Sequence, residues 1–416
     1  MAQVGLDEAQ SWVISRCERL APRQLLLREA LGCVLAEDVV SSEVVPPFAN
    51  TAMDGFAVRA EDVASVPVDL IVKATLPAGA RPTADHHVGP GEAVRIMTGA
   101  AIPSGADSIV PIENVDRSRG PEATVVTVLK SARFGDAVRA AGEDITAGQR
   151  IFGTGTVLNA GHIGMLASIG RAELLAYPRP RVGVLSTGDE LIAPPTPLEV
   201  GQIRDSNRYT LLALVELAGC EAVDLGLARD DDGAIDQLVR RGVETCDALV
   251  TSGGVSVGDF DFVKVVLDRL AKADGTPMRW MQVAIKPAKP LAFGVISGKP
   301  VFGLPGNPVS CMVSFELFAR PGLRRLMGHS EESLHRSPVR AIADEGLRRD
   351  PDGKTHFTRV VAAFADDGRI HVRSTGSQGS NLLSSMAFAD ALAVLPDGPS
   401  VTAGGEVDVL LLDRRT

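Results

Sequence analysis

Between residues 179 and 327, short apolar runs alternate with longer stretches in which apolar residues recur at helical spacing. The short runs predict buried strands at residues 181–186, 222–225, 248–252 and 301–304. The longer stretches predict helices at residues 206–217, 235–242, 262–270 and 309–318. Asp205 or Ser206 is a suitable cap for the first of these helices. Strands that alternate with helices form right-handed βαβ units, so a parallel sheet is expected here.

The chain before this segment has a different pattern. Residues 6–20 and 25–35 carry apolar residues at helical spacing and are predicted as two helices separated by Pro22. Residues 46–144 contain short alternating strands, such as 93–97 and 124–129, between Gly and Pro turns. Residues 161–175 predict a helix interrupted by glycines. We expect it to pack with the N-terminal helices as one discontinuous domain.

After the α/β segment, which Pro321 is expected to end, the pattern changes again. Residues 336–416 return to short alternating strands with turns at Asp352-Gly353 and Asp367-Gly368. A small β-barrel or sandwich is predicted there. The expected domains are therefore residues 1–45 with 145–178, 46–144, 179–327 and 328–416.

The composition is that of a folded globular protein. The chain has 416 residues, of which 45% are hydrophobic and 23% charged, so two to four domains are expected. The net charge of −10 disfavours non-specific binding of nucleic acid, because an acidic surface repels the phosphate backbone.

The sequence also indicates the cellular compartment in which the protein is expected. Neither a signal segment nor an uninterrupted apolar run of the roughly 20 residues that a transmembrane helix needs is visible, so no membrane association is expected. The five cysteines form no CxxC pair, which disfavours a redox or zinc motif. An odd and sparse set of cysteines is typical of a reducing compartment, and a cytoplasmic location is expected.

Three glycine-containing loops directly follow predicted strands, at residues 187–190, 253–261 and 305–308. In an open parallel sheet, ligands bind beyond the carboxyl ends of the strands. Glycines allow backbone N–H groups to approach phosphate oxygens, and the helix that follows each loop adds donors. Each loop alone is also compatible with an ordinary turn, but three at one edge favour a site for a phosphate-bearing, nucleotide-like ligand.

The same loops carry carboxylates, including Asp189, Glu190, Asp259 and Asp261. Acidic groups beside a phosphate repel it unless a cation intervenes, and Mg²⁺ held by one or two carboxylates plus phosphate oxygens resolves the conflict. The alternative is that these residues cap helices, which suits Asp259 best.

Other segments offer charged or polar groups on short turns. Residues 286–290 place two lysines between prolines, an arrangement suited to an oxoanion, although solvated lysines are equally common. Asp54, Thr98 and the turn at residues 139–144 are each also compatible with plain turns. HExxH and GxxxxGK[ST] motifs are missing from the sequence, which disfavours a zinc hydrolase and a P-loop enzyme.

Eight segments resemble, in order, the signatures of the molybdopterin molybdenumtransferase family, which includes bacterial MoeA and the E domain of gephyrin. They are PPFANTAMDGFAV, RIMTGA, VRAAGEDI, STGDEL, SGGVSVGDFDF, IKPAKP, GLPGNP and TGSQGS. The resemblance implies a multidomain α/β plus β protein. A three-layer α/β domain with a mostly parallel sheet would be joined by a β-rich N-terminal domain, a helical linker domain and a C-terminal small β-barrel.

The resemblance also implies the activity, which is insertion of molybdate into adenylylated molybdopterin with release of AMP in the presence of Mg²⁺. The implied catalytic residues are Asp54, Thr98, Asp144, Glu190, Asp230 and Asp261. Among these, Glu190 and Asp261 would bind the metal. The implied substrate-binding residues are Gly188, Ser252, Gly253, Gly254, Ser256, Lys286, Lys289, Pro305, Gly306, Asn307, Pro308, Ser310, Arg359 and Ser380.

The family further implies a homodimer whose cleft lies between the α/β domain of one subunit and the β-rich domain of the other. A molybdopterin adenylyltransferase is a possible partner. Three positions depart from the family pattern: Ala288 replaces the usual Gly, Thr51 the usual Ser and Phe56 the usual Tyr. Ala288 would be strained if its backbone needs a positive φ. The alternative functions are a molybdopterin adenylyltransferase and a non-catalytic scaffold of the same fold.

Overall fold

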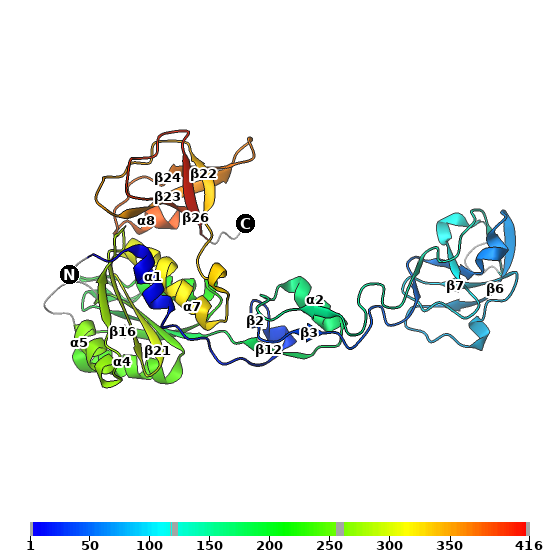
Figure 1. The fold of residues 1–416 in the computed structure, drawn as a ribbon, viewed down its shortest axis with the longest axis horizontal. Helices are drawn as coiled ribbons and strands as arrows, with labels where there is room; N and C mark the ends of the chain where they lie inside the picture. The colour runs from blue at the N-terminus through cyan, green and yellow to red at the C-terminus, as the bar shows by residue number, and fades with distance from the viewer. Residues whose placement is uncertain (1–2, 117, 119–123, 255–261, 413–416) are drawn as a thin grey trace. The chain divides into compact units, whose positions relative to one another are not determined.

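The computed structural model describes residues 3–116, 118, 124–254 and 262–412 (Figure 1). The chain divides into two compact units. Unit 1 comprises Met1–Leu25, Gly32–Ala36 and Leu175–Thr416, and unit 2 comprises Leu26–Leu31 and Glu37–Leu174. The four domain boundaries expected from the sequence stay predictions.

Unit 1 contains a six-stranded sheet in the order β16-β13-β17-β21-β20-β18. Its strands are β13 (Arg181–Thr187), β16 (Glu221–Ala228), β17 (Ala248–Ser252), β18 (Arg279–Gln282), β20 (Pro290–Ile296) and β21 (Lys299–Leu304). The first four in the sheet order are parallel, whereas β20 and β18 are antiparallel to their neighbours. The predicted mostly parallel sheet is confirmed, with the four strands in the predicted places.

Helices cover both faces of this sheet. On one face, α4 (Asp232–Thr245) and α5 (Phe262–Ala273) bury residues such as Val239 and Val266 against Leu249 (Figure 1). The other face is covered by α1 (Leu6–Ile14), α3 (Asn207–Leu217), α6 (Pro308–Ser314), the π-helix η5 (Phe315–Ala319) and α7 (Arg320–Leu326). The three-layer arrangement is therefore confirmed.

Pro321 does not end this part of the chain as expected. It is the second residue of α7, which continues directly from η5 and runs through Pro321 to Leu326. The helix predicted at residues 309–318 is present, but its second half is the π-helix η5.

The C-terminal strands form a closed barrel, which decides between the barrel and the sandwich. Its strands are β22 (Val339–Ala343), β23 (Thr355–Phe364), β24 (Ile370–Ser374), β25 (Ala391–Leu395) and β26 (Glu406–Leu411). Closure arises because β23 pairs with both β24 and β25. The two-residue strand β19 (Ile285–Lys286) adds to β23 in parallel, which brings the lysine-proline turn to the barrel.

The helix predicted at residues 25–35 is wrong. That segment forms β1 (Arg23–Leu26), the short helix η1 (Leu27–Glu29) and β2 (Val34–Leu35). Its apolar residues pair with β12 (Glu173–Tyr177), with Leu35 opposite Ala176. The helix expected at residues 161–175 is α2 (Ala160–Ser168) and ends before β12 begins. Strand pairing over a long sequence separation thus overrides the local helical spacing.

Unit 2 is built on a five-stranded sheet in the order β8-β5-β7-β6-β9. The strands are β5 (Gly55–Val58), β6 (Val68–Leu76), β7 (Glu92–Ile96), β8 (Ser108–Pro111) and β9 (Val125–Val128). Two short pairs accompany it, β3 (Val39–Val40) with β11 (Arg150–Phe152) and β4 (Asn50–Thr51) with β10 (Val138–Arg139). Unit 2 has its own buried clusters, around Leu70 and around Leu76.

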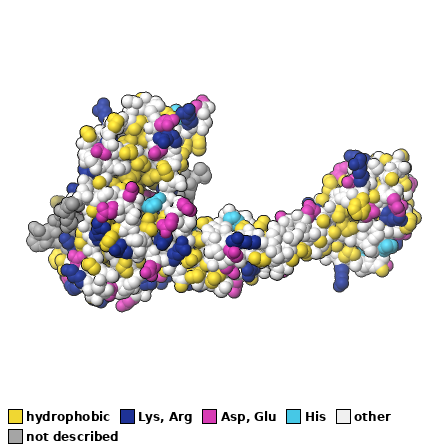
Figure 2. All heavy atoms as spheres, viewed as in Figure 1, with side chains coloured by type: hydrophobic (Ala, Val, Ile, Leu, Met, Phe, Trp, Pro, Cys, Tyr) yellow, Lys and Arg dark blue, Asp and Glu magenta, His cyan; other side chains and the backbone are white. Residues whose placement is uncertain are grey.

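Several smaller elements complete the fold. They are η2 (Ala60–Val63), η3 (Ala84–His86), η4 (Ile112–Asn114), β14 (Leu191–Ile192), β15 (Ile203–Arg204), η6 (Glu331–Ser333) and α8 (Leu383–Ala387). Among the described residues, no helix combines the length and apolar character needed to cross a membrane. On the face drawn in Figure 2, basic and acidic side chains of the described residues are interspersed.

Candidate functional site

The glycine loops that follow β13, β17 and β21 lie at one edge of the sheet, because the three strands are parallel neighbours. The loops approach so closely that a Cβ atom on Gly253 would lie 2.9 Å from the Thr187 carbonyl oxygen. A Cβ on Gly306 would lie 3.8 Å from the Gly253 Cα. The predicted convergence is confirmed for the described parts of these loops, and glycine is required at position 253, where φ is +93°.

Asn207 is a site residue that the sequence interpretation missed. It is the first residue of α3, and its Nδ2 donates hydrogen bonds to Ser252 Oγ and to the Gly306 carbonyl oxygen, both at 2.7 Å. It therefore links the end of β17 to the loop after β21. The capping function expected of Asp205 or Ser206 falls to Asp205, whose Oδ1 accepts from the Arg208 N–H.

Carboxylates gather where β13 and β16 end. The Asp230 N–H donates to Asp189 Oδ1 at 3.2 Å, and the Glu190 carboxylate folds back over Gly188, whose added Cβ would lie 2.7 Å from Glu190 Oε2. Burial raises the pKa of Asp230, and the negative charges of Asp189 and Glu190 raise it further. Glu190 and Asp230 are thus brought together, with Asp189 as a third member that the site prediction omitted.

Mg²⁺ was expected at Glu190 and Asp261. Asp261 and Ser256 lie outside the described residues, so their predicted roles stay predictions. Within the described ranges, no group of three or more His, Cys, Asp or Glu side chains is arranged to hold a metal ion. Glu190 and Asp230 offer hard oxygen ligands whose mutual repulsion a cation would relieve. This fits a Mg²⁺ that takes one or two carboxylates and completes its shell with phosphate oxygens.

Arg359 is a buried cation at the barrel end of unit 1. Its side chain is fully enclosed, with 1% of the residue exposed, and burial lowers the pKa of the guanidinium to about 10. Nε donates to Ser385 Oγ at 3.1 Å and Nη2 to the Gly379 carbonyl at 3.0 Å. In the described part of the chain these partners are neutral, and no ion pair offsets the charge. Gln378, also missed, holds the Arg359 backbone, because its Oε1 accepts from Arg359 N at 2.9 Å.

Arg359 lines a cavity of about 140 Å³ together with Lys286. The charged and titratable residues around this oxoanion cavity are Lys286, Arg348, Arg349, His356, Arg359 and Asp350. Water occupies roughly 10–15 Å³ by a comparable measure, so the volume has room for a small polyatomic anion. With cations in excess of its one carboxylate, the cavity is suited to an oxoanion.

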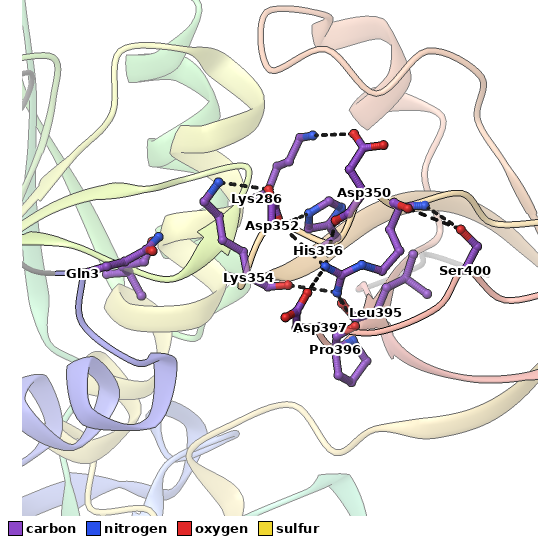
Figure 3. Close-up of polar contacts among 12 residues, drawn as sticks. Gln3, Lys286, Asp350, Asp352, Lys354, His356, Leu395, Pro396, Asp397 and Ser400 are labelled. Carbon is purple, nitrogen blue, oxygen red and sulfur yellow. Dashed lines mark hydrogen bonds and ion pairs between the residues drawn. The ribbon is translucent and has the colours of Figure 1, made fainter.

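Figure 3 shows how the wall of this cavity is held. Lys286 Nζ lies 3.9 Å from the exposed Asp350 carboxylate, a weak contact that leaves the lysine available. Asp352 accepts from His356 Nε2 and from Lys354 Nζ, each at 2.9 Å. The hydrogen bond with Lys354, followed by the one with His356, holds the pKa of Asp352 far below its usual range. Asp352 also lies 3.5 Å from Arg349, which bonds to Asp397 as well. Arg349 and His356 are therefore paired within the wall, and the excess positive charge of the cavity comes from Lys286, Arg348 and Arg359.

Of the remaining predicted ligands, Ser380 follows Gly379, whose carbonyl accepts from Arg359. The Val309 N–H at the start of α6 donates to the Ser380 carbonyl at 3.1 Å, which joins the Pro305–Pro308 turn and buried Ser310 to the Ser380 loop. Lys289 is exposed and is not among the residues that line the cavity, and its carbonyl accepts from Val283 N at 2.7 Å.

The departure from the family pattern at position 288 has a structural consequence. Ala288 has a φ of +75° and is 2% exposed, so a residue with a Cβ occupies a backbone conformation that glycine adopts freely. The expected strain is confirmed, and it falls in the turn that presents Lys286.

In unit 2, the structure brings Asp54 and Thr98 together. Asp54 Oδ1 accepts from Thr98 N at 2.6 Å and from Thr98 Oγ1 at 2.7 Å. These bonds, the one with the hydroxyl first, lower the pKa of Asp54, so the carboxylate stays ionised. Thr51 replaces the usual serine without loss of a contact, because its hydroxyl donates to the Met53 carbonyl at 2.6 Å.

The residue that follows Asp54 in this turn, Gly55, must be a glycine for steric reasons. A Cβ there would lie 2.1 Å from the Val110 carbonyl oxygen, so only glycine lets β5 approach β8 directly after Asp54. Asp144 is exposed, and its carboxylate forms no hydrogen bond or ion pair with any described residue, so it is not part of the Asp54–Thr98 pair.

Three family models match the chain in order. They are "MoeA N-terminal region (domain I and II)" at residues 4–170, "Probable molybdopterin binding domain" at residues 183–325, and "MoeA C-terminal region (domain IV)" at residues 340–412.

Named relatives match over nearly the whole length. The chain is 36% identical over 404 residues to the molybdopterin molybdenumtransferase of Haemophilus influenzae, covering 96% of each chain. It is 38% identical over 416 residues to molybdopterin molybdenumtransferase 2 of Mycobacterium tuberculosis, covering 97% of this chain and 98% of that one.

A solved structure agrees with the fold. The molybdopterin biosynthesis MoeA protein of Pyrococcus horikoshii OT3 is 28% identical, with a TM-score of 0.76 over 99% of this chain and all of that one. The sequence signatures, the three-layer sheet, the closed barrel and these matches lead to one conclusion: the chain belongs to the MoeA family.

Proposed function

We propose that this protein is a molybdopterin molybdenumtransferase, which inserts molybdate into adenylylated molybdopterin and releases AMP. The chain matches relatives of that name over nearly their full length. The glycine loops supply donors for a nucleotide phosphate, and the oxoanion cavity supplies cations for molybdate.

The observation that carries this proposal is the buried Arg359 guanidinium. A buried charge without a counter-ion is costly, and such groups persist where they bind a charged ligand. Arg359 has only neutral partners in the described part of the chain, and it shares the oxoanion cavity with Lys286. A tetrahedral dianion would supply the missing charge.

The protein's own groups have separable tasks. Lys286 and Arg359 bind and orient the oxoanion, and Gly188, Ser252, Gly253, Gly254, Pro305, Gly306, Asn307 and Pro308 shape the cradle for the pterin nucleotide. Mg²⁺, held by Glu190 with Asp230 or Asp261, would offset negative charge on the phosphate as AMP departs. Asp54, kept ionised by Thr98, can accept a hydrogen bond or a proton from substrate or water. The reaction needs no protein nucleophile.

We further propose that the enzyme acts as a homodimer in the cytoplasm and that a molybdopterin adenylyltransferase is its partner. All five cysteines are buried and free of disulfides, which supports a reducing compartment.

The direct test is AMP release from adenylylated molybdopterin with Mg²⁺, in the presence and absence of molybdate. We expect molybdate-dependent release. ATP-dependent adenylylation of molybdopterin without molybdate would instead indicate an adenylyltransferase, and binding without turnover would indicate a scaffold.

Arg359→Met tests the oxoanion cavity. Removal of a buried charged partner costs about 2–5 kcal/mol of binding, so the KM for molybdate should rise by about 100-fold. The free energy of unfolding should fall by no more than about 1 kcal/mol, because the variant also removes an unpaired buried charge. Arg373→Met, at an exposed arginine on the same barrel, is the control. An unchanged molybdate KM in Arg359→Met would exclude the cavity.

Glu190→Ala and Asp54→Ala test the two carboxylates. Each should abolish molybdate-dependent AMP release, because one removes a metal ligand and the other the ionised acceptor held by Thr98. Glu199→Ala, at an exposed position, should retain full activity. Near-UV circular dichroism should show an intact fold in all three, and normal turnover in both site variants would refute the roles.

A further inference from the structure

The Asn207 carboxamide joins the end of β17 to the turn after β21, two segments that lie far apart in the sequence. Its Nδ2 donates to Ser252 Oγ, at the end of β17, and to the Gly306 carbonyl, in the loop after β21, both at 2.7 Å. Ser252 is 2% exposed, and its hydroxyl also lies 3.9 Å from Cys311 Sγ. Both loops carry residues that the proposed function assigns to the pterin nucleotide.

The orientation of the carboxamide is settled by its partners. A carbonyl oxygen accepts hydrogen bonds and cannot donate them, so the Gly306 carbonyl requires the NH₂ group of Asn207 on its side. An amide NH₂ has two hydrogens, and both are used by these two bonds. Both N–H groups of the Asn207 carboxamide are therefore already bonded to protein acceptors when no ligand is bound.

The backbone that presents Asn207 is itself fixed. The next residue, Arg208, is buried, and its Nε donates to Asp205 Oδ2 at 2.8 Å, while its Nη1 bonds to Asp224 on β16. The Arg208 N–H donates to Asp205 Oδ1 at 3.2 Å. Asn207 therefore extends from an anchored helix start and not from a freely moving loop.

We propose that Asn207 is a positioning residue that fixes the separation between the Ser252–Gly254 segment at the end of β17 and the Pro305–Pro308 turn after β21, so that both engage the pterin nucleotide together. This rests on the proposed function for the identity of the ligand. Because both donors bind protein groups, Asn207 acts through the loops and not by touching the reacting atoms. The closeness of Gly306 to Gly253 gives the loops little room to adjust if the link is lost.

This position predicts a selective kinetic effect. Loss of two hydrogen bonds in Asn207→Ala should raise the KM for adenylylated molybdopterin by about 10-fold. Asn207→Asp, which has the same shape but places an oxygen against the Gly306 carbonyl, should raise it by about 100-fold. The KM for molybdate should change less than about two-fold in both, because the oxoanion cavity does not include these loops.

Steady-state kinetics with each substrate varied in turn, together with melting temperatures, test the proposal. Glu216→Gln, at an exposed position on the same helix, should leave both KM values unchanged. If Asn207→Ala does not fold, Asn207→Ser, whose hydroxyl is too short to span both acceptors, takes its place. Equal increases in both KM values, or none in either, would overturn the proposal and leave Asn207 a structural residue.

A double-mutant cycle isolates the link. Asn207→Ala with Ser252→Ala should reduce kcat/KM by less than the product of the single effects, because the hydrogen bond between Asn207 and Ser252 is lost in both single variants. Additive effects would contradict the link. If the wild type released no AMP, the proposed function would fail, whereas calorimetric binding of adenylylated molybdopterin would still decide whether Asn207→Ala weakens the cradle.

Discussion

At the scale of single residues, the site depends on groups whose partners are far away in sequence. Asn207 reaches Ser252 and Gly306, 45 and 99 residues away. Arg359 matters because the described structure offers it no counter-ion, which local spacing does not reveal. By contrast, Ala288 stands out in the sequence, since the family pattern places glycine there and the structure gives that position a positive φ.

Ala288→Gly tests the strain in the lysine-proline turn. A left-handed conformation costs a residue with a Cβ about 1–2 kcal/mol, and glycine at this position removes that cost. This gain should offset two losses of the variant, the buried methyl group and the greater conformational freedom of glycine in the unfolded chain. Ala292→Gly, at a fully buried alanine in β20, has the same losses without the relief. Urea denaturation should therefore find Ala288→Gly less destabilising than Ala292→Gly by about 1–2 kcal/mol. Equal losses would show that the turn is not strained.

At the scale of elements, the sequence predicted the four parallel strands and the helices between them to within a few residues, because a buried βαβ pattern is long and periodic. It failed at residues 25–35, where leucines at helical spacing lie in strands and a short helix. Their pairing with β12 depends on residues roughly 140 positions later, which no local pattern contains. Asp54 and Thr98, both named as site residues from the sequence, are hydrogen-bonded in the structure, whereas Asp144 stands apart from them.

His371 on β24 gives the barrel a pH-dependent contact. Nδ1 lies 2.6 Å from Asp344 and Nε2 3.1 Å from Asp367, and these hydrogen bonds, the one with Asp344 first, raise the pKa of His371. The contribution to stability is complete below the unfolded pKa of about 6.5 and is lost as the pH rises through the higher folded value. The difference in unfolding free energy between wild type and His371→Gln should therefore shrink above about pH 6.5.

Urea denaturation at several pH values between about 5.5 and 8.5 measures that difference across the window. Asp366→Asn, at an exposed position in the turn before β24, is the control and should track the wild type at every pH. A difference that stays constant across the range would show that His371 does not change charge on unfolding.

At the scale of the whole molecule, the division into two compact units with separate buried cores predicts two unfolding transitions in calorimetry. Gly164→Ala should raise the transition of unit 2, because Gly164 is an exposed glycine inside α2 with space for a Cβ. Ala292→Gly should lower the transition of unit 1. These two variants assign each transition to its unit.

Molybdate should then stabilise unit 1 alone, because every described residue of the oxoanion cavity belongs to it. A ligand at about 100 times its Kd adds roughly 2.7 kcal/mol to the unfolding free energy of the unit that binds it. In Arg359→Met, the shift should disappear, whereas in Arg373→Met it should persist. Sulfate at matched ionic strength separates specific binding from a general salt effect. A molybdate shift in the unit 2 transition, or one retained by Arg359→Met, would place the oxoanion elsewhere in the protein.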